Sequence, residues 1–149
     1  MRLPYTVTCV GLIILGVCYG IDQDPQETLH YFLNLSEQRG NIFYQAKLDG
    51  VDYRALLKGA MAKDEKSLTA LFKYTVKGSL MGEGADTHGA ILQALLYYYG
   101  DKMYSKVLGR LDQLVRREVI AYLDERFGLE SYSKRFPRTY ALAPHKHST

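Results

Sequence analysis

The sequence predicts an all-α fold of five to six short amphipathic helices arranged in antiparallel pairs. After Asp24, apolar residues recur at intervals of three and four, which is the period of a helix and not of a strand. Aspartates stand before most of these apolar runs, where a helix N-cap is expected, and glycines follow several of them. With 149 residues, of which 47% are hydrophobic, the chain can bury the core of a single domain.

We expect one helical domain over residues 21–128, with helices over 24–40, 52–61, 64–77, 86–99, 101–108 and 112–128. Residues 41–50 give conflicting signals and are expected to be irregular. The glycine-rich segment 78–84 is expected to be a hinge or a tight turn between helices. Residues 129–149 contain two prolines and are expected to form an extended C-terminal tail, from which aromatic side chains dock on the helices: Tyr132, Phe136 and Tyr140.

A faint internal repeat relates residues 55–61 to residues 90–96 at a distance of 35 positions. Helix pairs that recur at this interval are typical of helical-repeat proteins, in which each pair buries its apolar stripe against the next one. Any bundle of short helices can produce the same spacing by chance. The pattern therefore leaves two architectures open, a short repeat stack and an irregular bundle.

One segment resembles a known family. The pattern of Asp112, Val115, Arg116, Val119 and Leu123 resembles the second helix of a HEAT repeat, and the similarity covers about one repeat, residues 101–128. The glycine or alanine that often follows the leucine is an aspartate here. The resemblance implies a right-handed stack of antiparallel helix pairs that serves as a docking surface, in which Arg116 bonds to neighbouring repeats.

The first 20 residues are expected to be a signal peptide. Arg2 supplies a positive start, and an uninterrupted apolar and small-residue stretch runs from residue 9 to residue 20. Cleavage after Gly20 would give a secreted or periplasmic protein without stable membrane insertion. Retention of the leader as an N-terminal membrane anchor is the alternative, because residues 3–19 are near the lower length limit for a spanning helix. Both cysteines lie in this leader, so the mature domain would contain no disulfide.

The basic residues that follow position 101 form the first candidate surface. The formal net charge of the chain is only +3, which is too small to indicate a nucleic-acid protein. Lys102, Lys106 and Arg110 are spaced by four and therefore share one helical face, and Arg117 follows on the next helix. Such a row would attract an anionic lipid head group, an envelope polymer or an acidic protein. The alternative is a solvated face without a partner.

The run of tyrosines from 97 to 99 forms the second candidate surface. Consecutive helical residues point about 100° apart, so one apolar stripe cannot bury all three rings. We expect Tyr97 and Tyr98 to offer phenol groups to a partner, because tyrosine is enriched at interfaces. The alternative is that these rings fill the boundary between the core and the solvent.

A carboxylate and histidine cluster is the only candidate for chemistry. Glu83, Asp86 and His88 could bind a metal or shuttle protons. The alternative assigns Asp86 to a helix N-cap and His88 to the core, where the imidazole would make one hydrogen bond. The glycines before this helix lack the lysine and hydroxyl pair of a phosphate-binding loop, and no serine lies in a nucleophile elbow. No cofactor or metal site is expected.

These observations favour an exported, all-helical domain that binds a protein partner and is not an enzyme. Its expected binding residues are Tyr97, Tyr98, Lys102, Lys106, Arg110 and Arg117. Two alternatives remain. The first is a small hydrolase of envelope polymers that uses Glu83, Asp86 and His88. The second is a membrane-tethered structural protein, if the leader is not cleaved.

Overall fold

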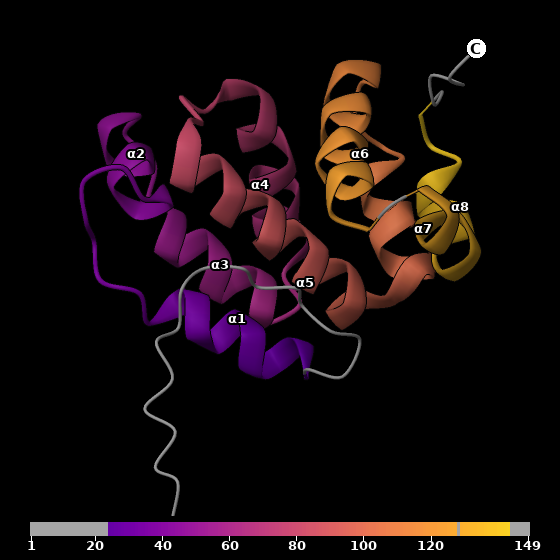
Figure 1. Cartoon of the computed structure of the whole chain (residues 1–149), viewed down its shortest axis with the longest axis horizontal. Helices are drawn as coiled ribbons and strands as arrows, with labels where there is room; N and C mark the ends of the chain where they lie inside the picture. The colour runs from indigo at the N-terminus through magenta and orange to yellow at the C-terminus, as the bar shows by residue number, and fades with distance from the viewer. Residues whose placement is uncertain (1–23, 128, 144–149) are drawn as a thin grey trace, which may run out of the picture.

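The computed structural model describes residues 24–127 and 129–143, and within them the fold is all-α, as expected (Figure 1). The predicted leader lies outside the described residues. Eight helices are present in the described part, and it contains no strand. They are α1 (Pro25–Leu33), α2 (Ile42–Leu48), α3 (Tyr53–Met61), α4 (Glu65–Lys77), α5 (Gly82–Leu108), α6 (Gln113–Phe127), α7 (Leu129–Arg135) and α8 (Pro137–Tyr140).

Aspartate caps define where four of these helices begin, as the sequence predicted. The carboxylates of Asp24, Asp52 and Asp64 accept hydrogen bonds from backbone amides in the first turns of α1, α3 and α4. Asp112 accepts one from the amide of Val115 at 2.9 Å, at the start of α6. These side chains satisfy amides that a helix start otherwise leaves without partners.

The first helix ends at Leu33 and not at Gly40, and α2 occupies part of the segment expected to be irregular. The guanidinium group of Arg54 on α3 donates hydrogen bonds to the carbonyls of Leu33 and Leu35, which fixes the chain as it leaves α1. Asn41 then caps α2, because its side-chain oxygen accepts a hydrogen bond from the amide of Tyr44 at 3.1 Å. The buried face of α2 consists of Ile42, Phe43 and Ala46.

The long helix α5 begins at Gly82, four positions before the expected cap at Asp86. It is interrupted at Gly100, whose φ of 74° and ψ of 159° are not helical, so the predicted break at this glycine is confirmed. A residue with a side chain rarely adopts this backbone conformation. The stripe of Ile91, Leu92 and Leu95 is fully buried in the first half of α5, and the second half contributes Tyr104.

The C-terminal segment is helical over residues 129–135 and 137–140, so the prediction of an extended tail is wrong there. The expected docking of its aromatic side chains is confirmed: Tyr132 and Phe136 are buried, and Tyr140 is half-buried. The ring of Tyr132 stacks on that of Phe127 with centroids 5.3 Å apart. Pro137 occupies the first turn of α8, where its missing amide hydrogen costs nothing.

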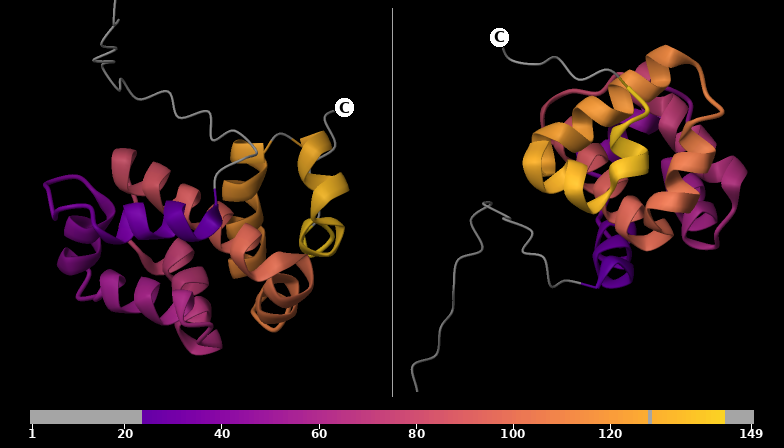
Figure 2. Two further views of the ribbon diagram at one scale, coloured as in Figure 1. Left: turned by 90° about the horizontal axis from the view of Figure 1, so that it is seen from below. Right: turned by 90° about the vertical axis from the view of Figure 1, so that its right-hand side faces the viewer.

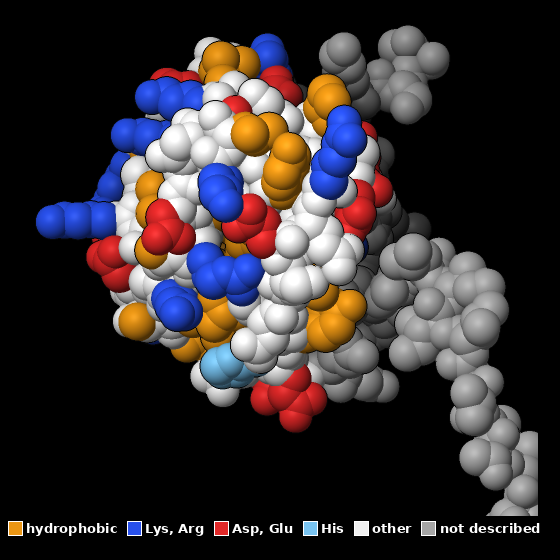
Figure 3. All heavy atoms as spheres, turned by 90° about the vertical axis from the view of Figure 1, so that its left-hand side faces the viewer, with side chains coloured by type: hydrophobic (Ala, Val, Ile, Leu, Met, Phe, Trp, Pro, Cys, Tyr) orange, Lys and Arg blue, Asp and Glu red, His pale blue; other side chains and the backbone are white. Residues whose placement is uncertain are grey.

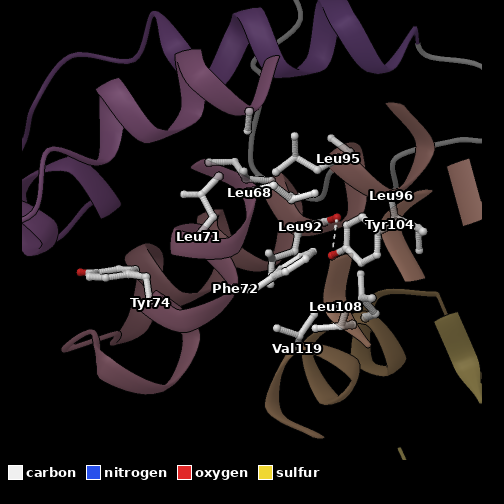
Figure 4. Packing of buried hydrophobic residues seen from close by; sticks show 14 of the residues in the cluster. Leu68, Leu71, Phe72, Tyr74, Leu92, Leu95, Leu96, Tyr104, Leu108 and Val119 are labelled. Carbon is white, nitrogen blue, oxygen red and sulfur yellow. Dashed lines mark hydrogen bonds between the residues drawn. The ribbon is translucent and has the colours of Figure 1, made fainter. Parts of the chain in front are cut away.

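Helix α5 is the centre of the arrangement. It packs against α1, α2, α4, α6 and α8. Figure 1 and Figure 2 both show α6, α7 and α8 gathered at one end of the molecule and α1, α2 and α3 at the other. Figure 4 shows the core between α4, α5 and α6, where Phe72 meets Tyr104 edge to face with ring centroids 4.8 Å apart. In residues 24–127 and 129–143, no helix is both long and apolar enough to cross a bilayer.

Candidate functional site

The tyrosines at 98 and 99 bind the end of α3. The hydroxyl of Tyr98 donates a hydrogen bond to the carbonyl of Met61, and that of Tyr99 donates one to the carbonyl of Ala60, both at 2.7 Å. The last carbonyls of a helix have no partner within the helix, so these two phenols complete α3. Burial raises the pKa of Tyr99 to about 12.

Lys63, in the turn between α3 and α4, makes a second contact with Tyr98. Its ammonium group donates a hydrogen bond to the carbonyl of Tyr98 at 2.7 Å and lies 3.4 Å from the centroid of the Tyr98 ring. Burial lowers the pKa of this lysine. Lys63 also has a φ of 64°, a backbone conformation that favours glycine. The ring, the hydroxyl and the carbonyl of Tyr98 thus each contact the end of α3 or the turn that follows it.

Tyr97 faces the C-terminal helices. Its half-buried ring lies 5.1 Å from that of Phe136 and 5.5 Å from that of Phe127, measured between centroids, and the guanidinium group of Arg135 is 4.5 Å from its centroid. The structure therefore places both tyrosines predicted to bind a partner in contacts within the chain. No sequence signal links Tyr97 to residues nearly 40 positions away.

The predicted basic row divides into two groups. Arg110 forms an ion pair with Glu65 at 2.8 Å, and Arg117 forms one with Glu118 at 2.7 Å. Lys102 and Lys106 remain together on one exposed face of α5, and none of the ion pairs of the described residues involves either of them. Of the four predicted cations, Lys102 and Lys106 therefore lie side by side without an ion pair in the described residues, whereas the two arginines are each paired with a glutamate.

A third cation joins these lysines from α8. Arg138 lines an open groove together with Lys102, Lys106, Ser105 and Leu142, and the volume of this groove is about 530 Å³. Arg138 is exposed and takes part in none of the ion pairs of the described residues. Two walls from distant parts of the chain therefore present positive charge to the same space. Arg138 was not among the predicted binding residues, because residues 129–149 were expected to form an extended tail.

Asp101 holds the second wall of the groove in place. Its carboxylate accepts hydrogen bonds from the amides of Arg138 at 2.9 Å and Thr139 at 2.8 Å. Asp101 is the first residue of the helix expected over residues 101–108, but its carboxylate binds amides at the N-terminus of α8. At the other end of the groove, Leu142 lies beside Gly109, where an added Cβ would stand 3.5 Å from its side chain. These contacts fix the distance between α5 and α8.

The structure does not assemble the predicted cluster of Glu83, Asp86 and His88. Both carboxylates are exposed, whereas the imidazole is completely buried. Its Nδ1 lies 2.6 Å from the hydroxyl of Tyr53, and its Nε2 lies 2.9 Å from the hydroxyl of Thr75. Burial lowers the pKa of His88 to about 3, so the ring is neutral at pH 7. The histidine is a core residue with two hydrogen-bond partners, where the sequence predicted one.

The glycine-rich segment forms a tight turn bound to α2. The side chain of Gln45 accepts a hydrogen bond from the amide of Met81 at 3.1 Å and donates one to its carbonyl at 2.8 Å. Asp49 accepts hydrogen bonds from the amide of Ser79 and the hydroxyl of Tyr74. Gly84 lies close to the side-chain amide of Gln45, which would have to shift if a Cβ were added at Gly84. These bonds favour the predicted turn over a hinge.

Two other hollows of the described chain contain charged groups that already have partners within it. Between α2 and α3, a hollow of about 360 Å³ contains Arg54, which is bound to the carbonyls of α1, and Lys47, which is paired with Glu37. Between α5 and α6, a hollow of about 250 Å³ contains Glu118 beside its partner Arg117 on α6. Figure 3 shows a different face, on which positive and negative side chains are intermixed. Among residues 24–127 and 129–143, no three His, Cys, Asp or Glu side chains are grouped to hold a metal ion.

Comparison with protein-family models, with curated proteins and with solved structures gives no match for this chain. The geometry of the described residues therefore carries the functional argument. Of the six predicted binding residues, it brings Lys102 and Lys106 together at one groove and adds Arg138 to them.

Proposed function

We propose that this chain is an exported, all-helical protein-binding domain whose binding surface is the groove between α5 and α8. The observation that carries the proposal is the set of three exposed cations, Lys102, Lys106 and Arg138, around one open groove. Other cations near the row are neutralised by acidic neighbours, as in the ion pairs of Arg110 and Arg117. Positive groups that form no ion pair within the described chain attract an external partner.

The helical frame supports a binding role. Asp101 and Leu142 fix α8 against α5, so both walls of the groove are formed before a partner arrives. A preformed surface loses less conformational entropy on binding than a mobile one. The burial of His88 argues against the hydrolase alternative, because a neutral imidazole enclosed by Tyr53 and Thr75 is not placed to exchange protons with a substrate.

Site-specific crosslinking in the cells that make this protein tests the proposal. A photoreactive amino acid replaces Ser105, which lines the groove, or Ser79, which is exposed in the turn before α5. We expect a discrete adduct with another protein from position 105 and none of the same size from position 79. The adduct should disappear when Lys102 and Lys106 are both changed to glutamate. Failure to obtain any adduct specific to position 105 would overturn the proposal.

A further inference from the structure

We propose that the groove between α5 and α8 binds an acidic peptide segment, with carboxylates held by Lys102 and Lys106 on one wall and by Arg138 on the other. The inference rests on the proposed function and names the chemistry of the partner. It follows from three features: the spacing of the cations, the apolar floor of the groove and the way in which Asp101 occupies the end of α8.

The spacing of the cations fits carboxylates on a peptide. Lys102 and Lys106 are one helical turn apart, so their Cβ atoms are separated by roughly 5–6 Å. In an extended peptide, side chains on the same side are separated by roughly 6.6 Å, a difference that two flexible lysine side chains can absorb. Arg138 adds a planar group that can bind a carboxylate through two parallel hydrogen bonds.

The floor of the groove favours a peptide over a bare anion. Leu142 is half-buried and Ser105 lies between the two lysines along the helix, so an apolar side chain of the partner can cover Leu142 while its neighbours reach the cations. Phosphate sites in proteins often include free backbone amides, but the amides of Arg138 and Thr139 are already used by the Asp101 carboxylate.

The shape of the groove also favours a peptide over a lipid surface. A bilayer is bound by apolar side chains that protrude from a basic face. Leu142 is half-buried, and the most exposed apolar residues of the described chain, Leu48 and Met81, belong to α2 and to the turn before α5. An extended segment of chain can follow the open hollow that these cations surround more closely than a flat surface can.

Two matched peptides test the charge requirement. The first carries three glutamates around one leucine, and its twin carries glutamines instead, both with the same uncharged dye. We expect the full chain to bind the acidic peptide about tenfold more tightly than the twin, because the twin lacks three exposed charge pairs that each contribute modestly. The affinity should fall as salt is added. Equal binding of the two peptides would overturn the inference.

Matched variants of the protein test the site. The double change Lys102→Glu and Lys106→Glu should remove most of the affinity for the acidic peptide. Lys73→Glu with Lys77→Glu is the control, since these lysines are exposed on α4 with the same spacing and give the same change in net charge. Arg138→Glu should weaken binding severalfold. The inference fails if the Lys102 and Lys106 variant binds as well as the control.

A third experiment distinguishes an acidic peptide from a lipid surface, and its comparison with the crosslinking distinguishes this inference from the proposed function. Vesicles with anionic head groups replace the peptide, and binding to them that exceeds binding to the acidic peptide would overturn the inference in favour of a lipid surface. If the crosslink from position 105 persists while the acidic peptide and its twin bind equally, the groove still binds a protein but does not select acidic segments. If both experiments fail, the proposed function fails as well.

Discussion

The ammonium group of Lys63 lies 2.7 Å from the carbonyl oxygen of Tyr98 and 3.4 Å from the centroid of the same residue's ring. In return, the Tyr98 hydroxyl donates a hydrogen bond to the carbonyl of Met61, two positions before Lys63. The turn after α3 and the end of the first half of α5 are thus bound to each other in both directions. This reciprocal contact stabilises the two helices at a point where the lysine backbone is strained.

Replacement of Lys63 by glycine or by alanine distinguishes the stabilising contact with Tyr98 from the cost of the positive φ at Lys63. Both changes remove the hydrogen bond and the cation–π contact, but only glycine also relieves the positive φ. We therefore expect Lys63→Ala to be less stable than Lys63→Gly by about 1 kcal/mol in urea unfolding. Equal stabilities would show that the left-handed conformation costs nothing here.

Removal of the hydroxyls of the tyrosine pair should lower stability. Tyr98→Phe removes the hydroxyl that donates to the carbonyl of Met61, and Tyr99→Phe leaves the carbonyl of Ala60 with backbone donors alone, so each should reduce the free energy of unfolding by about 1 kcal/mol. Tyr31→Phe is the control, because that ring is 60% exposed on α1. If the two variants unfold like the wild-type protein but lose the crosslink from position 105, these phenols serve a partner and not the fold.

The buried histidine predicts a loss of stability in mild acid. The pKa of His88 is about 3 in the folded chain, against an ordinary value of 6.5. Between these values the unfolded chain binds a proton that the folded chain excludes, so stability is complete above pH 6.5 and falls as the pH drops, by about 1.4 kcal/mol per pH unit. Urea unfolding between pH 5 and 7 measures this slope.

Two variants test whether the histidine causes this slope. His88→Gln removes the imidazole and should flatten the slope between pH 5 and 6.5. The control, Thr75→Val, keeps the imidazole but removes one hydrogen-bond partner, so it should lower stability at every pH and retain the slope. A slope that is unchanged in His88→Gln would assign the acid sensitivity to other groups.

Substitution of Gly100, where α5 is interrupted, should lower stability through the backbone conformation alone. No atom lies within 4 Å of an added Cβ at this position, so a substitution would be opposed only by the backbone conformation. Gly100→Ala should therefore reduce the free energy of unfolding by about 1–3 kcal/mol without a steric clash. An alanine variant as stable as the wild type, measured by urea unfolding, would mean that α5 straightens at little cost.

The local features of this fold could be predicted from the sequence, because they depend on neighbouring residues. Asp24, Asp52, Asp64 and Asp112 cap helices where they were expected to, since an N-cap needs only an amide two or three positions ahead. The break at Gly100 was equally visible. The short helix α2 was missed because Ile42, Phe43 and Tyr44 suit a strand as well as a helix.

The candidate site could be predicted only in part. The spacing of Lys102 and Lys106 gives their common face directly, whereas Arg138 reaches the same groove through Asp101, 37 positions before it. Pro137 permits either a helix start or an extended chain, so the sequence supported both. The partners of Tyr97 likewise lie far along the chain: Phe127 on α6, Arg135 at the end of α7 and Phe136 between α7 and α8. The HEAT-like pattern of residues 101–128 stays a prediction.

The aromatic rings of the C-terminal helices have a consequence for how the chain acquires its fold. Tyr97 and Phe127 are covered by Phe136, and Phe127 also stacks on Tyr132. A nascent polypeptide that stops short of these residues leaves both rings in contact with water. Closure of this part of the core must therefore await the synthesis of residues 132–136.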